Sequence, residues 1–162
     1  MSWDRFHDIA ADLDYPMLIV TAACDGRRAG CLVGFATQCS IDPLRFVVYL
    51  SEKNHTCGVA MGSPVLNVHF ASSADRSLAE LFGGETGDAV DKFSRCRWHE
   101  GVSGVPVLTD CTRWFAGRVL DRLEGRGDHV GFVLEPIDGG VGPWPGQLSL
   151  QTVLDIEPGH DA

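Results

Sequence analysis

The residues best suited to chemistry in this sequence lie in the short segment Ser51-Glu52-Lys53-Asn54-His55-Thr56. It brings two hydroxyls, an amide, an imidazole and an ammonium group close together. The segment follows a β-branched run, and Asn54 is of a type that caps helices. Backbone N–H groups at a helix start, with Lys53 and the Thr56 hydroxyl, are suited to binding a phosphate. The same spacing also describes a simple helix cap beside a solvated lysine.

Motifs of the commonest catalytic sites are absent from the sequence. It contains no G-x-S-x-G, no G-x-x-x-x-G-K-[ST], no G-x-G-x-x-G after a predicted strand and no H-E-x-x-H. These absences exclude the usual hydrolase, P-loop, Rossmann and zinc-peptidase patterns. The six cysteines form no C-x-x-C pair, and the close Cys/His pairs have no second half at zinc spacing. We therefore interpret the cysteines as small apolar residues and predict no metal site.

Length and composition predict a single soluble domain over residues 1–162. Hydrophobic residues make up 44% of the chain and charged residues 22%, which is typical of globular domains. The 13 basic and 22 acidic residues give a net charge of −9, which disfavours nucleic acid as a partner. The chain has no uncharged apolar run long enough to span a membrane, and its N-terminal segment is acidic where a signal peptide is basic. We therefore expect a cytoplasmic protein with no membrane partner.

Most of the remaining sequence predicts β-strands that position this segment. Residues 17–24 and 30–39 flank Asp25-Gly26, a dipeptide typical of tight hairpin turns, so we predict a hairpin. A third predicted strand, 45–51, leads directly into the polar segment. The further predicted strands cover residues 64–70, 105–108, 112–123, 129–137 and 148–156, with a surface loop over 138–146.

Short helices are predicted around these strands from apolar spacing and capping residues. The predicted helices cover residues 3–13, 55–61 behind the cap Asn54, and 78–82 between the cap Asp75 and Gly83-Gly84, with a further turn near residues 89–93. About seven strands with three short helices favour a mainly β fold, a closed or split β-barrel, over a parallel βαβ sheet.

Four segments, in chain order, resemble the flavin reductase-like family. They are residues 29–43 (AGCLVGFATQCSIDP), residues 51–56, Asp91-Lys92-Phe93 and Gly127-Asp128-His129. Further matches at residues 17–20, 70, 78–82 and 105–108 fall in the same order, and the resemblance covers about residues 3–137. The family's fold is the FMN-binding split barrel, so the resemblance implies a split β-barrel with short flanking helices.

The resemblance also implies an activity and a site. It implies an NAD(P)H:flavin oxidoreductase, a homodimer that holds FMN or FAD near its subunit interface, with the reductase partner of a two-component monooxygenase as one role. Carried over by position, the flavin is expected to meet the backbone of Gly34, Phe35 and Ala36, the hydroxyls of Thr37 and Ser40, and Ser51, Lys53, His55 and Thr56 around its phosphate. His129 is expected near the nicotinamide of NADH or NADPH, with Asp128 holding its tautomer. No catalytic acid or base is implied, because the flavin ring itself accepts the hydride.

The chain departs from the family pattern in its second predicted strand. Leu32, Gly34 and Phe35 stand where the family usually carries a Thr and a Ser pair, so hydroxyls that contact the cofactor are missing. A loosely held flavin, or a deazaflavin-dependent reductase, is consistent with this loss. A non-catalytic flavin- or haem-binding carrier or sensor on the same barrel is the alternative from another functional class.

Overall fold

The alternating and β-branched runs of the sequence form strands in the computed structural model, which describes residues 3–159. The strands are β1 (Leu18–Cys24), β2 (Arg27–Val33), β3 (Ala36–Ser40), β4 (Arg45–Ser51), β5 (Val65–Phe70), β6 (Trp98–Glu100), β7 (Pro106–Leu108), β8 (Arg113–Leu123) and β9 (His129–Val141). The α-helices are α1 (Trp3–Ala11), α2 (His55–Ala60) and α3 (Arg76–Gly84), and short 3-10 helices cover Lys92–Ser94, Val102–Gly104 and Leu150–Thr152.

The first hairpin is encoded by its turn. Asp25 and Gly26 have φ angles of 51° and 74°, and β1 and β2 pair antiparallel on either side of them. Two successive residues with positive φ form the tight turn whose twist matches that of paired strands. The predicted hairpin is therefore confirmed. The predicted single strand over residues 30–39 is wrong, because the chain leaves the hairpin at Gly34 and Phe35, and β3 pairs with β4 instead.

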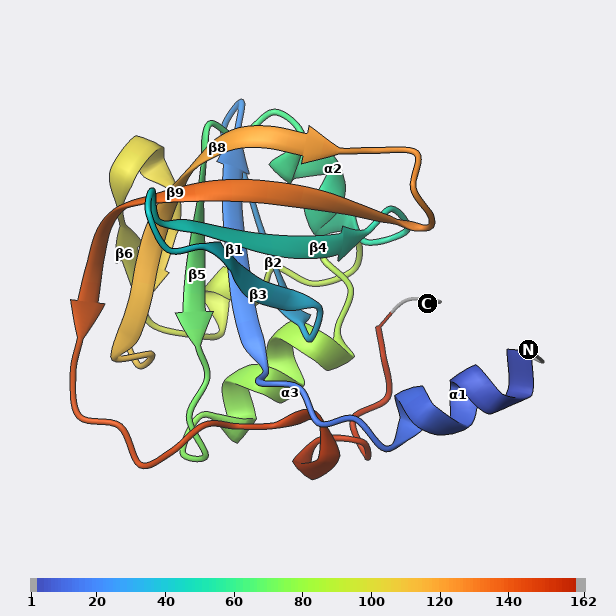
Figure 1. Ribbon diagram of the computed structural model, residues 1–162. Coiled ribbons are helices and arrows are strands. Elements are labelled where there is room, and N and C mark those ends of the chain that lie inside the picture. The colour runs from blue at the N-terminus through green and yellow to red at the C-terminus, as the bar shows by residue number, and fades with distance from the viewer. Residues whose placement is uncertain (1–2, 160–162) are drawn as a thin grey trace.

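That break determines the shape of the main sheet. Its seven strands have the order β2-β1-β5-β8-β9-β4-β3, so the two edge strands are consecutive in the chain. The sheet must curl to bring its edges within two residues of each other, although no ladder joins β2 to β3 in the described part of the chain. Figure 1 shows the result, with β4 and β9 running across β1 and β5. This is the predicted mainly β, split-barrel fold.

Two strand segments in the structure were not predicted. β9 continues through residues 138–141, which were predicted as loop, because Gly139 and Gly140 lie flat against β8. A Cβ on Gly140 would lie 2.6 Å from Trp114 Nε1, so only glycine allows this approach. β6, which was not predicted, pairs with β7 in a separate two-stranded sheet.

The helices follow their predicted positions with two differences. Asn54 caps α2 as predicted, and its Oδ1 accepts a hydrogen bond from the Thr56 N–H at 2.9 Å. Asp75 precedes α3, but its carboxylate accepts hydrogen bonds from Ser72 instead of capping the helix. The helix also continues through both glycines predicted to end it, and the missing Cβ of Gly83 leaves room for Leu32.

The predicted closing strand over residues 148–156 is wrong. β1 is already paired on both sides, by β2 and β5, so no sheet edge is free beside it. The segment makes isolated bridges and a 3-10 turn, and it buries Leu148 and Val153 against Met17 and Ala79.

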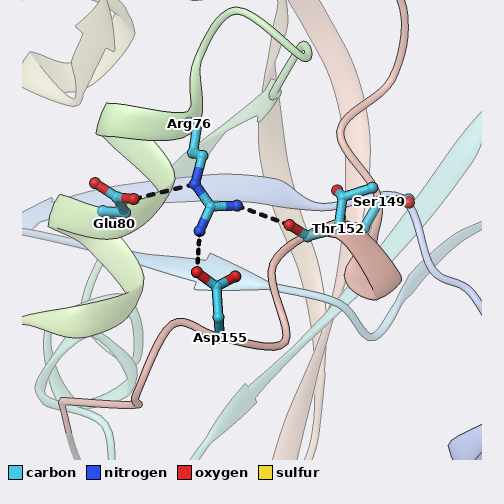
Figure 2. A network of polar contacts seen from close by, with 5 residues as sticks. All are labelled: Arg76, Glu80, Ser149, Thr152 and Asp155. Carbon is cyan, nitrogen blue, oxygen red and sulfur yellow. Dashed lines mark hydrogen bonds and ion pairs between the residues drawn. The ribbon is translucent and has the colours of Figure 1, made fainter.

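Arg76 fastens this C-terminal segment to α3. Figure 2 shows its guanidinium between Glu80 of the same helix, the Thr152 carbonyl and the Asp155 carboxylate. The hydrogen bond from Arg76 lowers the pKa of Asp155. The segment is thus held by one branched polar contact as well as by apolar packing.

Both faces of β1 and β5 are buried, and the outer face carries three polar side chains beside the apolar Ile19 and Val65. Thr21, Asn67 and His69 are completely buried there, and all three bond to residues 105–108. His69 Nδ1 lies 2.9 Å from the Ile19 carbonyl, and His69 Nε2 accepts the Leu108 N–H at 3.0 Å. These two bonds require a neutral ring with its hydrogen on Nδ1. Burial lowers the pKa of His69 to about 4. His69 is therefore a structural histidine, held by two hydrogen bonds within the fold.

Acid should therefore weaken the fold through His69. Its pKa is about 4 in the folded chain and 6.5 ordinarily, so the unfolded chain takes up a proton first as pH falls. The contribution of His69 is complete above pH 6.5 and is lost progressively toward pH 4, with a maximum of roughly 3 kcal/mol. We expect His69→Gln to be less stable at pH 7 but to lose less free energy of unfolding between pH 7 and 4.5, measured by urea denaturation. The exposed His7→Gln should behave as wild type, and an unchanged pH slope in His69→Gln would contradict this role.

Candidate functional site

The pairing of β4 with β9 brings two of the predicted motifs together. Ser51 lies directly opposite His129 in the ladder, and the Glu52 N–H donates to the Asp128 carbonyl at 2.9 Å. The segments 51–56 and 127–129, distant in sequence, therefore lie side by side at one end of the sheet.

Within residues 51–56, the side chains divide between surface and interior. Lys53 is exposed, and its positive charge helps to lower the pKa of Asp128. Ser51 is buried, and its Oγ accepts the Lys53 N–H at 3.3 Å. Lys53 therefore presents a positive charge at the surface of this loop.

The other two predicted phosphate contacts are already engaged within the protein. Thr56 is buried, and its hydroxyl is hydrogen-bonded to the Cys31 thiol, whose pKa burial raises to about 11. A phosphate would reach this hydroxyl only after that contact opened. His55 is half-buried, and its Nδ1 lies 2.8 Å from Asp88 Oδ1.

A hollow of about 340 Å³ lies beside these segments. It is lined by Phe35, Tyr49, Arg126, Gly127, Asp128 and His129. The Phe35 ring lies 5.3 Å from the His129 ring between centroids, so a predicted flavin residue and the predicted nicotinamide residue share one wall. Asp128 Oδ1 lies 2.7 Å from His129 Nδ1, and this hydrogen bond is the main cause of the lowered pKa of Asp128. Asp128 thus fixes the ring with its hydrogen on Nδ1 and leaves Nε2 as an acceptor.

The predicted residues of β3 extend away from this hollow. Ser40 pairs with Arg45 at the far end of β4 from Ser51, about 20 Å away at the usual strand rise. Thr37 lies between, exposed, with its hydroxyl donating to the Gln38 carbonyl. Gly34 and Ala36 flank Phe35, whose carbonyl accepts the Tyr49 N–H at 2.9 Å. A single ligand can contact both Ser40 and residues 51–56 only if it lies along β4.

The positions that lack the family's hydroxyls differ in their surroundings. Leu32 lies on the outer face of β2, packed against α3, where a Cβ on Gly83 would be 2.8 Å from Leu32 Cδ2. Leu32 therefore removes no contact from the hollow. Phe35 instead lines the hollow, and its ring also makes an edge contact with Tyr15 at 5.7 Å. An aromatic wall has replaced a polar one at this position.

Sequence reasoning missed Tyr49 and Arg126. Tyr49 lies two residues before Ser51 on β4, and its ring covers Gly131, where a Cβ would lie 2.7 Å away. Strand periodicity was a signal for Tyr49, since it shares a face with Ser51. Arg126 had no signal beyond its place in a glycine-rich turn.

No group of three or more His, Cys, Asp or Glu side chains within residues 3–159 is placed to hold a metal ion. None of the helices described there has the length and apolar character needed to cross a membrane.

Comparison with known proteins assigns the family. The model of the flavin reductase like domain matches residues 10–147. The chain belongs to the flavin reductase-like family. It is 28% identical over 118 residues to the FMN reductase (NADH) RutF of Bradyrhizobium diazoefficiens, an alignment that covers 73% of this chain and 65% of that protein. The chain thus spans slightly less than two thirds of that relative.

Two further proteins support the family assignment and the fold. The reductase component of 4-nitrophenol 4-monooxygenase/4-nitrocatechol 2-monooxygenase from Rhodococcus opacus is 28% identical over 138 residues, covering 85% of this chain and 72% of that one. The solved structure of a flavin reductase domain protein from Arthrobacter sp. FB24 superposes with a TM-score of 0.81 at 21% identity, covering 90% of this chain and 89% of that one. The predicted family is confirmed.

Lys53 offers a direct test of the phosphate position in this flavin reductase-like chain. We expect Lys53→Ala to weaken FMN about tenfold while riboflavin, which has no phosphate, changes less than twofold, because one charge-assisted hydrogen bond is lost. Titration followed by flavin fluorescence measures both affinities. Arg5→Ala, which removes an exposed cation from α1, is the matched control and should change neither. Equal losses for both ligands would contradict a phosphate contact at Lys53.

Proposed function

We propose that this protein is an NAD(P)H-dependent flavin reductase, which binds FMN or FAD and passes hydride to it from NADH or NADPH. The observation that carries the proposal is the hollow shared by Phe35 and His129, with Ser51 at the start of the Lys53 loop opposite His129 in the ladder, in a chain of the flavin reductase-like family.

The residues of the hollow fit a flavin. Its volume of about 340 Å³ falls within the usual range for small-molecule sites, roughly 300–1,000 Å³. Among its lining residues, Phe35 and Tyr49 provide aromatic surface for a planar ring. Lys53, on the loop that follows β4, is proposed as the cation for a phosphate. A bound flavin supplies the hydride-accepting ring. The chain's own task is to hold the two reactants in contact.

His129 is proposed as a positioning residue for the nicotinamide. Asp128 keeps the Nδ1 hydrogen in place, so the neutral ring presents Nε2 as an acceptor. The N–H₂ of a nicotinamide carboxamide can donate to Nε2.

The extent of the domain, the cellular location, the oligomeric state and the partner are also proposed. We propose one domain over residues 1–162 that works in the cytoplasm as a homodimer. One relative is named as the reductase component of a monooxygenase, which supports a monooxygenase as the consumer of reduced flavin. α1 supports the dimer, because Trp3, Phe6 and Ile9 form one apolar stripe with 80%, 51% and 58% of their surfaces exposed. Figure 1 shows α1 at the side of the molecule, away from the sheet.

Steady-state assays test the activity and the role of His129 together. We expect the protein with added FMN or FAD to consume NADH or NADPH, followed by nicotinamide absorbance. His129→Ala should raise KM or slow flavin reduction about tenfold, about 1.4 kcal/mol, with flavin Kd within twofold. His129→Gln, which keeps a polar acceptor, should recover part of the rate. No turnover with any pair would favour the non-catalytic carrier, and turnover only with a deazaflavin would favour that cofactor.

Light scattering tests the dimer and the surface that forms it. Leu120 is the only large apolar side chain of β8 among the exposed residues described, so α1 offers the more apolar surface. We expect Phe6→Asp with Ile9→Asp to convert a micromolar dimer into a monomer, because two charges would enter an apolar contact. Asp8→Asn, on the opposite face of α1, should leave the dimer intact. A wild-type monomer in the presence of flavin would contradict the proposal.

A further inference from the structure

An aromatic hollow of about 280 Å³ lies at the end of β9. Three aromatic rings, one cation and two apolar residues line it: Phe70, Trp114, Trp144, Arg113, Gly140 and Val141. The candidate site lies at the other end of the strand, where His129 begins β9. Figure 1 shows these two ends of β9 on opposite sides of the molecule. The aromatic hollow is therefore a separate feature, which the proposed reductase function does not use.

The loop that carries Trp144 is held against the start of β8. The Gly142 N–H donates to the Thr112 carbonyl at 2.8 Å, and the Thr112 hydroxyl donates to the Pro143 carbonyl at 2.6 Å. A Cβ on Gly142 would lie 2.7 Å from Thr112 Cβ, so a larger residue would not fit without a shift of the backbone. Pro143 and Pro145 restrict the backbone on either side of Trp144. The fold itself thus positions the Trp144 ring as a wall of the hollow.

Arg113 brings a positive charge to these aromatic walls. Its guanidinium lies over the Trp144 ring, 4.6 Å from the centroid, and its Nε donates a long hydrogen bond of 3.5 Å to the Gly142 carbonyl. Arg113 forms no ion pair with any carboxylate within residues 3–159, and none of the lining residues is acidic. The Trp144 indole N–H is buried and has no acceptor among the described residues. These two groups favour a ligand that carries negative charge and hydrogen-bond acceptors.

We propose that this hollow is a second small-molecule site, which binds a one-ring aromatic carboxylate. The rings of Phe70, Trp114 and Trp144 provide stacking and edge contacts for one aromatic ring. Arginine binds a carboxylate through its planar fork of N–H donors, and a guanidinium that stacks on an indole keeps those in-plane donors available. The volume of about 280 Å³ lies just below the range of roughly 300–1,000 Å³ for drug-sized ligands, which suits a single ring. Arg113 would repel a cation, and an aliphatic acid would leave the aromatic walls without a stacking partner.

Benzoate and benzamide are the probes that test this site, because they have nearly the same shape and only benzoate is charged at neutral pH. We expect the protein to bind benzoate at least tenfold more tightly than benzamide, measured by calorimetry, since only benzoate forms a charge-assisted pair with Arg113. Acetate, which has the charge without the ring, should also bind at least tenfold more weakly than benzoate. Saturating FMN should leave the benzoate affinity unchanged, because the two hollows lie at opposite ends of β9.

Substitutions at Arg113 and Val141 test the charge from both sides. Arg113→Ala should weaken benzoate about tenfold and benzamide less than twofold, and Arg113→Lys should recover part of the loss. Arg118→Ala removes a cation of the same strand from outside the hollow and should change neither affinity. Val141 lines the hollow and is 87% exposed, so Val141→Glu should leave the fold intact while giving Arg113 a carboxylate partner that competes with the ligand. It should weaken benzoate about tenfold, whereas the uncharged Val141→Gln should change it less than twofold.

Three results would overturn the aromatic carboxylate site. They are no benzoate binding at millimolar concentrations, equal affinities for benzoate and benzamide, and displacement of benzoate by FMN, which would place benzoate in the candidate site instead. The thermal midpoints of the Arg113 and Val141 variants ensure that a loss of benzoate binding reports on the hollow and not on unfolding. Selective benzoate binding by a protein that reduces no flavin would support this site and contradict only the proposed function.

Discussion

The ladder between β4 and β9 is the interaction on which the site depends. It places Ser51 opposite His129, and the bond from the Glu52 N–H to the Asp128 carbonyl extends the same pairing beyond the strand ends. Because side chains alternate between the faces of a strand, a shift of one residue would send His129 to the other face. The hydrogen bond to Asp128 and the contact with Phe35 would then both be lost. The arrangement of the candidate site therefore depends on the register between β4 and β9.

The outer face of the sheet combines apolar packing with buried polar contacts. Thr21, Asn67 and His69 fasten residues 105–108 across β1 and β5. A buried polar group is costly without a partner, so each bond here specifies one position of the covering segment. Asn67 Oδ1 lacks a hydrogen-bond partner among the described residues, which leaves one such cost in place. These bonds thus specify the position of residues 105–108, which is sensitive to the protonation of His69.

The curl of the sheet explains how two neighbouring residues acquire different environments. Leu32 ends on the outside of the barrel beneath α3, while Phe35, just past the break in the strands, faces the hollow. The Leu32 side chain packs against a helix as a result, and the Phe35 ring lines the hollow. A flavin ring held here would rely on ring contacts and backbone groups more than on side-chain hydroxyls.

Features that depend on a few adjacent residues were predictable from the sequence alone. Asp25-Gly26 determines a hairpin because its backbone angles are local, and Asn54 determines a cap because its side chain bonds the N–H two residues on. The family motifs, in their order along the chain, also predicted the fold class. Only the tertiary structure determined where the strands end and which segments pack against each residue. It ended β2 at Val33, extended β9 over Trp114, buried the Thr56 hydroxyl against Cys31, and brought residues 27–30 to residues 87–93. Each of these outcomes depends on close packing between segments far apart in the chain, and local propensity carries no information about such distances.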